Sequence, residues 1–324
     1  MAAPVASVAV IIPSYGDPQG LFRALESLAR QRPLPGAAAN EDNNAPPLTV
    51  QVVHSGAWDL PPKEQWPSLN LDWRLESVSP RRLSAAQARN RAVALSEAEL
   101  LVFLDADCLA GPHFLAGHLD AHRQGSTVVS GMVLPGDDDT TVAQAEYLVE
   151  FATTRLRRPG GAISAPACNV SIRRNLLDAV GGFPVLEAGE DVLLHLRLRQ
   201  QGHRLHLNPH AQVRHCGRQR LEDYRRHRRF IGAGLGQLTA QAEREGLFNR
   251  AVSLEYHVLR WICRSPWGSL LVAAKLFRLL MLLLQGDRLV LRMLPATLAL
   301  VFDGLWLEAG ACRQAYRRER ALHG

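Results

Sequence analysis

Residues 100–107 read LLVFLDAD, in which five apolar residues are followed at once by Asp105 and Asp107 on one turn. An uninterrupted apolar run of this length predicts a buried strand of a parallel sheet. In an open α/β sheet, ligands bind outside the carboxyl ends of the strands. The two carboxylates are therefore expected at the edge of the sheet where a ligand binds.

Outward from this stretch, short apolar runs alternate with segments of helical periodicity. This alternation predicts an α/β fold, with a doubly wound, mostly parallel sheet flanked by helices. The expected strands are 8–12, 48–53, 100–104 and 127–133, and the expected helices are about 21–30, 84–96 and 112–122.

The remaining segments differ in composition from this alternating pattern. Residues 33–47 are rich in proline, alanine and asparagine, which predicts a surface insertion. From residue 221 onward the chain is basic and strongly apolar, which predicts a helical C-terminal region. We therefore expect two domains, 1–220 and 221–324.

The overall composition is that of a globular protein. Of the 324 residues, 47% are hydrophobic and 21% are charged, and the net charge is +6. A basic balance suits nucleic acid, an anionic membrane or a phosphorylated substrate. No aromatic and basic residues interleave as in nucleic-acid readers, so nucleic acid is not expected as a partner. Five scattered cysteines without a C-x-x-C pair argue against a zinc site and predict reduced thiols in a cytoplasmic protein.

The two aspartates offer hard oxygen ligands, which suit Mg²⁺ or Mn²⁺ bridging to substrate phosphates. A solvated turn is the alternative, but the strand directly upstream favours a metal site. Arg89 lies in Ala-Arg-Asn-Arg, residues 88–91, and is either a surface charge or a cation that neutralises a diphosphate.

Three further side chains stand where chemistry is possible. Glu190 and Asp191 open a helical segment, where acids are either partners of the helix dipole or a general base. His215 ends the strand-like segment 211–214, and it is either structural or a nitrogen ligand to the same metal.

Taken in order, these segments resemble the family 2 glycosyltransferases, which have the GT-A fold. The resemblance extends over about residues 7–217, and no single motif carries it alone. The matching segments are VIIPSY (10–15), ARN (88–90), FLDAD (103–107), NVSIRR (169–174), VGGF (180–183), GED (189–191) and VRH (213–215).

The resemblance implies an inverting transfer of a sugar from a nucleotide-diphosphate sugar to an acceptor hydroxyl, on a glycan or a lipid-linked molecule. It makes 1–220 the catalytic domain. The implied nucleoside pocket is Pro13, Ser14 and Tyr15, and Asn169 faces the donor sugar. Arg89 lies near the phosphates, and Asp105 lies near the ribose and the metal, as a further metal residue. Asp107 would bind the metal directly with His215 completing the coordination, Asp191 would be the base, and Glu190 would support it or bind acceptor.

One segment departs from the family pattern. Where an acidic pair usually follows the second strand, this chain has His54 and Ser55, so recognition of the base by a carboxylate is not expected. A catalytically weak sugar-nucleotide-binding protein is one alternative. A nucleotidyltransferase is another, but the loop 13–18 lacks the glycine-rich, basic character such enzymes need.

The C-terminal region has two readings. Residues 267–284 have the length of a membrane span, but Lys275 and Arg278 fall inside it. A helix on the cytoplasmic face of the membrane, with basic flanks at 225–229 and 317–320, is weighed against a helix packed only on protein. Residues 257–261, HVLRW, lack the glutamine of the Q-x-x-R-W motif of processive synthases, which favours a single-addition enzyme.

Overall fold

The computed structural model describes residues 5–32, 46–56, 72–78, 81–137, 140–152, 165–248, 260, 263 and 269–323. The insertion predicted at 33–47 and the segment 257–261 lie largely outside these residues. The chain forms two compact units. The first contains residues 1–133, 164–185 and 202–215, and the second contains 134–163, 186–201 and 216–324. The boundary predicted after residue 220 falls inside the second unit, and the division into 1–220 and 221–324 stays a prediction.

The first unit is built on an eight-stranded sheet with the order β3-β2-β1-β4-β7-β6-β8-β5. One half is parallel: β1 (Val8–Tyr15) pairs with β2 (Leu48–Ser55) and with β4 (Leu100–Leu104), and β2 pairs with β3 (Asp72–Val78). All five residues of β4 are buried, as an apolar run without alternation predicts.

The other half of the sheet is antiparallel, so the sheet is mixed rather than mostly parallel. The strand β7 (Asn169–Arg173) runs antiparallel to β4 and to β6 (Val128–Pro135), and β5 (Cys108–Ala110) runs antiparallel to β8 (Leu205–His215). The short strands β5 and β7 were not predicted, because runs of three to five residues carry little periodicity.

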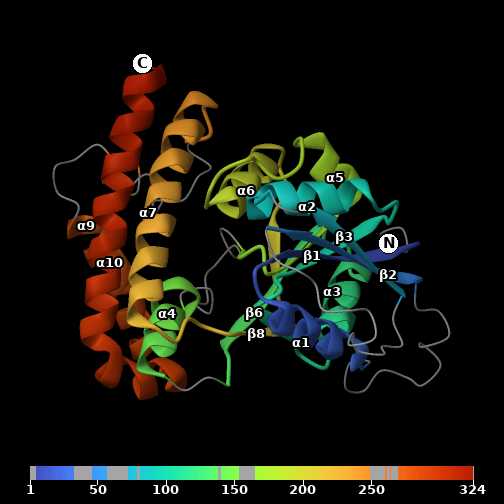
Figure 1. Ribbon diagram of the computed structural model, residues 1–324, viewed down its shortest axis with the longest axis horizontal. Coiled ribbons are helices and arrows are strands. Elements are labelled where there is room, and N and C mark those ends of the chain that lie inside the picture. Colours follow the sequence, from blue (N-terminus) through green and yellow to red (C-terminus); the bar gives the residue numbers. More distant parts are fainter. Residues whose placement is uncertain are drawn as a thin grey trace. The chain divides into compact units, whose positions relative to one another are not determined.

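Helices cover both faces of this sheet. In Figure 1, α1 (Pro18–Ala29) and α3 (Phe114–Arg123) lie on one face, and α2 (Ala85–Ala94) and α5 (Arg174–Ala179) lie on the other. The start of α2 follows from its sequence, since Ser84 and Gln87 form a capping box that satisfies two backbone N–H groups. The predicted α/β fold, a sheet flanked by helices, is confirmed.

A buried polar chain ties α3 to the sheet. Within it, Nε2 of His118 lies 2.9 Å from Oδ1 of Asn169, and Nδ1 of His118 lies 2.9 Å from Oγ of Ser171. The same hydroxyl lies 2.8 Å from Nε2 of His122. Burial lowers the pKa of His118 to about 3 and that of His122 to about 4, so both imidazoles are neutral in the folded protein at pH 7.

We expect these two histidines to make the protein acid-sensitive. In the unfolded chain their pKa is about 6.5, so the unfolded state binds more protons below that pH. Their contribution is complete above pH 6.5 and is lost as the pH falls toward the folded pKa, at about 2 kcal/mol per histidine by pH 5. Urea unfolding from pH 7 to pH 5 measures this loss. His122→Gln should flatten the pH dependence, whereas the control His210→Gln, at an exposed position, should leave it unchanged.

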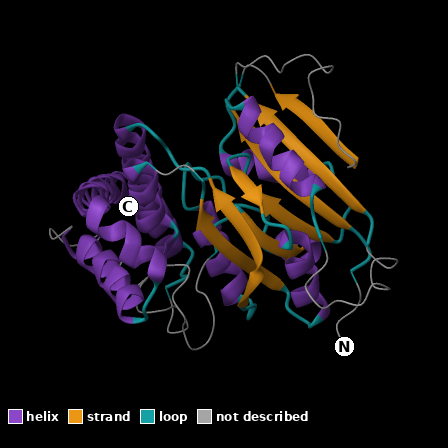
Figure 2. Ribbon diagram, turned by 90° about the horizontal axis from the view of Figure 1, so that it is seen from below, coloured by secondary structure: helices purple, strands orange, loops and turns teal. Residues whose placement is uncertain are grey.

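The second unit is helical in its described part (Figure 2), apart from the end of β6. Its helices are α4 (Thr141–Glu150), α6 (Glu190–Gln200), α7 (Leu221–Arg244), α9 (Ser269–Leu284) and α10 (Arg288–His323). The helices α7 and α10 approach so closely that only glycine fits at two positions. A Cβ on Gly232 would lie 2.2 Å from the carbonyl oxygen of Glu308, and one on Gly236 would lie 2.3 Å from that of Cys312.

Candidate functional site

The pairing of β5 with β8 brings two predicted metal ligands together. In this antiparallel register Cys108 lies opposite His215, which places His215 beside the residue that precedes Cys108. Oδ2 of Asp107 lies 3.5 Å from Nε2 of His215, and the Asp107 side chain is half exposed. A carboxylate oxygen and an imidazole nitrogen that converge beside solvent fit Mg²⁺ or Mn²⁺ with substrate oxygens and water as further ligands.

The other aspartate of the segment faces a different partner. Nη2 of Arg89, on α2, donates to Oδ1 of Asp105 at 2.6 Å. The arginine side chain is 3% exposed and the aspartate side chain 29% exposed. From the sequence, Arg89 is expected to be a surface charge or to neutralise a diphosphate. In the structure its guanidinium is buried and forms an ion pair with Asp105. The structure therefore supports a role for Arg89 in positioning Asp105.

We expect Asp105→Asn to destabilise the first unit, since it removes the negative charge of the carboxylate that accepts from the buried Arg89 guanidinium. Removing one partner of a buried pair costs about 3 kcal/mol or more, and the partial exposure of Asp105 reduces this to about 2 kcal/mol. Asp107→Asn, at a half-exposed position, should change the stability by less than about 1 kcal/mol. Urea unfolding of both variants tests the difference, and equal losses would contradict the distinction between the two carboxylates.

Asn90, the next residue of α2, links the segment 88–90 to the distant segment 180–183. Nδ2 of Asn90 donates to the carbonyl oxygen of Phe183, and the backbone N–H of Phe183 donates to Oδ1 of Asn90, both at 2.8 Å. Gly182 has φ +77°, and a Cβ there would lie 2.8 Å from Oδ1 of Asn90. The ring of Phe183 then lies under the guanidinium of Arg89, 5.4 Å from ring centroid to Cζ. The segment 182–183 therefore helps to hold Arg89 against Asp105.

The predicted nucleoside pocket lies at the carboxyl ends of β1 and β2. In their parallel register Ser14 pairs with His54 and Tyr15 with Ser55. Oγ of Ser14 lies 3.1 Å from Nδ1 of His54, and both side chains are buried. Burial lowers the pKa of His54, so a neutral imidazole stands where the family usually has a carboxylate. Ser55 accepts a hydrogen bond from the backbone N–H of Leu83 at 3.1 Å and thereby fixes the loop before α2.

Arg82 was not predicted as a residue of this region, but it lies against the predicted Tyr15. Tyr15 is 55% exposed, and the Cζ atom of Arg82 lies 4.8 Å from the centroid of its ring. Pro13, the third residue predicted here, is half-buried. An exposed aromatic ring beside a cation suits the face of a nucleobase. The spacing of Arg82 from the first motif gave no signal, because the loop before α2 meets β1 only in the folded chain.

Asn169 has its hydrogen bonds satisfied inside the protein. Its Nδ2 donates to the carbonyl oxygens of Met132 and Ala211, each at 3.0 Å, and its Oδ1 meets His118. The side chain is fully buried. The expectation that Asn169 faces the donor sugar is not supported by these contacts, which give it the structural role of joining β6, β7 and β8.

Glu190 and Asp191 belong to the second unit, where they form the first turn of α6. Gly189 precedes them with φ +82°, a conformation that favours glycine, and so ends the approaching loop. Glu190 is buried, and Asp191 is half-buried with its Oδ1 accepting from the backbone N–H of Val192 at 2.7 Å. Carboxylates in the first turn of a helix interact favourably with the helix dipole.

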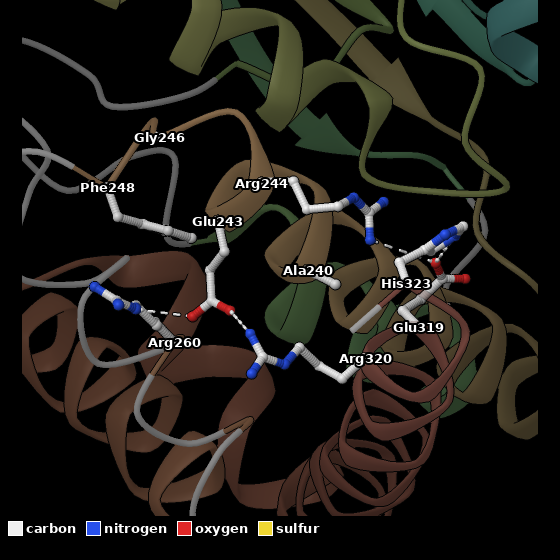
Figure 3. A pocket seen from close by; sticks show the side chains of 9 residues that line it. All are labelled: Ala240, Glu243, Arg244, Gly246, Phe248, Arg260, Glu319, Arg320 and His323. Atoms are coloured by element: carbon white, nitrogen blue, oxygen red, sulfur yellow. Dashed lines mark hydrogen bonds and ion pairs between the residues drawn. The ribbon is translucent and has the colours of Figure 1, made fainter.

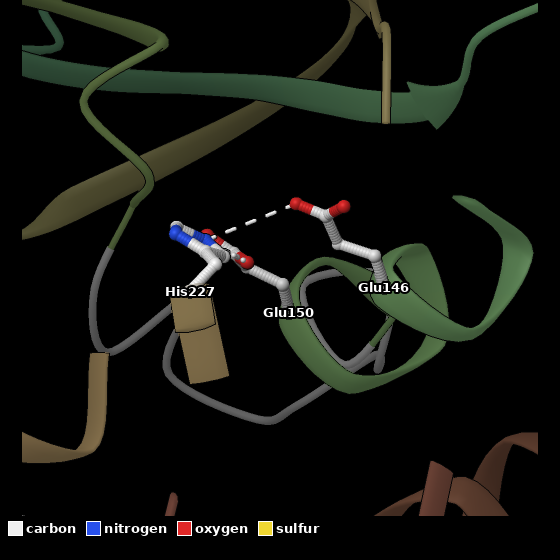
Figure 4. A group of neighbouring side chains, drawn as sticks. All are labelled: Glu146, Glu150 and His227. Carbon is white, nitrogen blue, oxygen red and sulfur yellow. Dashed lines mark hydrogen bonds and ion pairs between the residues drawn. The ribbon is translucent and has the colours of Figure 1, made fainter. Parts of the chain in front are cut away.

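A second group of potential ligands lies within the second unit. Oxygen and nitrogen atoms of Glu146, Glu150 and His227 come within 4.8 Å of one another (Figure 4). However, Arg218 and Arg228 donate to Glu146 and Glu150, respectively, and Arg228 is fully buried. A cation here would have to displace both arginines. We therefore interpret the group as a structural ion-pair cluster.

The same unit has a charged pocket of about 340 Å³. In Figure 3, Glu243 lies between Arg260 and Arg320, and Glu319 lies beside Arg244 and His323. Tyr316 also donates to Glu243, at 2.7 Å. Glu243 accepts from Arg260 and Tyr316, so it is poorly suited to accept a proton from a substrate.

A known protein family matches a segment of the chain that includes parts of both units. The sequence model of the family described as "Glycosyltransferase like family 2" matches residues 75–230. This range includes Arg89, Asp105, Asp107, Asp191 and His215. A search of curated proteins finds no match.

Solved structures share the fold. A mannosyltransferase, PcManGT from Pyrobaculum calidifontis, in complex with GDP-Man and Mn²⁺, is 20% identical, with a TM-score of 0.61 over 99% of this chain and 88% of that one. The S. aureus protein TarS, residues 1–349, in complex with UDP-GlcNAc, is 18% identical, with a TM-score of 0.49 over 97% of this chain and 92% of that one. At an identity of 20%, the similarity to PcManGT shows a shared fold and no more.

Proposed function

Because residues 75–230 match the model of the glycosyltransferase-like family 2 and the chain has the GT-A fold, we propose that it transfers a sugar from a nucleotide-diphosphate sugar to an acceptor hydroxyl with inversion at the anomeric carbon. The observation that carries the proposal is the convergence of Asp107 and His215 at 3.5 Å, beside the Arg89–Asp105 ion pair. Asp107 and His215 come from distant parts of the sequence, and both offer atoms that can bind a divalent cation.

Asp107 and His215 would hold a divalent cation, Mg²⁺ or Mn²⁺, which when bound offsets the negative charge that develops on the departing diphosphate. Asp105 is oriented by Arg89, and in this position it suits the ribose of the donor. Tyr15 offers its exposed ring to the nucleobase, with Ser14 and His54 behind it. Because His54 stands where the family usually has a carboxylate, the base is not recognised through a carboxylate at this position.

The chemical step needs a base for the acceptor hydroxyl, and we assign this role to Asp191. As the acceptor oxygen attacks the anomeric carbon from the face opposite the leaving group, its proton passes to the Asp191 carboxylate. The bond from the anomeric carbon to the diphosphate oxygen breaks in the same displacement, and the configuration inverts. Glu190, buried next to Asp191, supports this carboxylate or binds the acceptor. The acceptor is a glycan or a lipid-linked molecule, and one sugar is added per encounter.

Binding of nucleotide diphosphates tests the proposal most directly. Uridine, guanosine, adenosine, cytidine and thymidine diphosphates are titrated calorimetrically into the protein with and without Mn²⁺. We expect one base to be preferred, with binding that is tighter when Mn²⁺ is present. Negligible binding of all five nucleotides in both conditions would overturn the donor site. Hydrolysis of the matching nucleotide sugars then identifies the sugar.

A further inference from the structure

The second unit has a concentration of exposed apolar side chains on α9 and α10. Of the twelve exposed large hydrophobic residues in the described part of the chain, seven fall between positions 277 and 306. Three are on α9, at Phe277, Leu280 and Leu284, and four are on α10. The residues on α10 are Leu291, Leu298, Phe302 and Trp306, each between 51% and 57% exposed.

The exposed residues of α10 form one stripe along the helix. Their spacing of seven, four and four residues returns to the same side of a helix with 3.6 residues per turn. Pro295, Ala296 and Ala299 are exposed between them, and the rings of Phe302 and Trp306 stack at 6.4 Å between centroids. The opposite side of α10 packs within the unit, where Val301 and Leu305 are fully buried. The helix is therefore apolar on both sides, and only one side is covered.

Charges lie at the two ends of this stripe and not along it. Arg288 and Arg292 lie at one end, and Arg313, Arg317 and Arg318 lie at the other. Arg320, on the same turn, lies 3.8 Å from Glu243 and serves the charged pocket. The three acidic residues of α10 are engaged inside the unit. Asp303 accepts from Arg225 at 2.8 Å, Glu308 accepts from Lys275 and lies 3.3 Å from Nη1 of Arg228, and Glu319 lies 3.7 Å from Nε2 of His323.

We propose that the apolar stripe of α10, with its neighbours on α9, is a binding face for an anionic lipid bilayer. Apolar side chains that enter the acyl region, with arginines at both ends reaching the phosphate headgroups, are the pattern of an interfacial helix. A second copy of the chain would fit poorly. The arginines at the ends of its stripe would repel those of the first copy. The acidic residues of its α10 could not offset this repulsion, because they are already paired within their own unit. Charge complementarity therefore favours lipid.

The same contacts indicate that α10 lies on the bilayer and does not cross it. By length and composition alone, α10 is the one described helix that could span a membrane. However, the hydroxyl of Tyr224 donates to the carbonyl oxygen of Leu300 at 2.9 Å, and the Arg225–Asp303 and Arg228–Glu308 pairs bind α10 to α7. Crossing would draw the charged helix α7 into hydrocarbon, which is costly. Arg228, expected as part of a basic flank, is fully buried and serves this packing instead.

Sedimentation with vesicles tests the proposal on the full-length protein. We expect binding to vesicles of phosphatidylcholine that contain phosphatidylglycerol, weaker binding to phosphatidylcholine alone, and loss of binding at high salt. The double variant Phe302→Ser, Trp306→Ser should bind at least tenfold more weakly. The control double variant Leu95→Ser, Val185→Ser removes exposed apolar side chains elsewhere and should bind like the unchanged protein.

A second measurement distinguishes insertion from loose attraction. Brominated acyl chains should quench tryptophan fluorescence, and Trp306→Phe should bind vesicles normally but lose much of that quenching. Absence of vesicle binding, or binding that the double variant retains, would overturn the proposal. A dimer in solution that this double variant converts to a monomer would assign the stripe to a second copy. None of these readouts depends on sugar transfer, so they stand apart from the proposed activity.

Discussion

Asp107→Asn is expected to reduce sugar transfer at saturating donor at least about a hundredfold. The substitution keeps the size of the side chain and removes the charge that holds the divalent cation. Without that cation, the negative charge on the departing diphosphate is poorly stabilised. The affinity for Mn²⁺, measured by electron paramagnetic resonance, should fall together with the rate. Weak binding of the nucleoside should persist, because Ser14 and Tyr15 are unchanged.

The matched control for this variant is Asp120→Asn. Asp120 lies on α3 of the same unit, and its Oδ2 accepts only a surface hydrogen bond from Gln124 at 2.8 Å. It loses the same charge without touching the site, so transfer and Mn²⁺ affinity should remain near their original values. If Asp107→Asn keeps full activity and full Mn²⁺ affinity, the assignment of the metal to Asp107 and His215 is wrong.

Asp191→Asn should abolish most of the transfer while the donor still binds. Loss of a positioned general base costs about 10²- to 10⁴-fold in rate. The asparagine cannot take the proton of the acceptor hydroxyl, but it leaves Asp107, His215 and the nucleoside pocket intact. The expected result is therefore a fall in kcat with an unchanged dissociation constant for the donor. Rapid quench measurements of one turnover, combined with calorimetry of donor binding, separate the two quantities.

Asp223→Asn is the control for the second prediction. Like Asp191, Asp223 lies in the first turn of a helix, so both variants lose a similar interaction with a helix dipole. Its carboxylate is otherwise paired with Arg226 on the surface, at 2.9 Å. Transfer by this variant should be unaffected. Normal transfer by Asp191→Asn would show that another group is the base, and Glu190→Gln would then be examined in the same way.

Local sequence was enough to predict much of the first unit. The apolar run at 100–104 indicated a buried strand, and the helix expected over about 84–96 is α2, which Ser84 caps. Both are properties of neighbouring residues, since burial of a short apolar run and capping of a helix depend on little else. The ordered motifs also predicted the family and the GT-A fold. The strands β5 and β7 escaped notice, because runs of three to five residues carry little periodicity.

Only the tertiary structure decided which side chains meet. The register of Cys108 with His215 brings that histidine to Asp107 across more than a hundred residues, and no local pattern specifies it. Arg89 and Arg228 look like surface charges in the sequence, yet packing buries both against carboxylates. The reason is physical: a buried charge is stable only where the folded chain supplies a counter-charge. Thus the sequence alone determined that Asp105 and Asp107 follow a buried strand, and folding gave them different partners, Arg89 and His215.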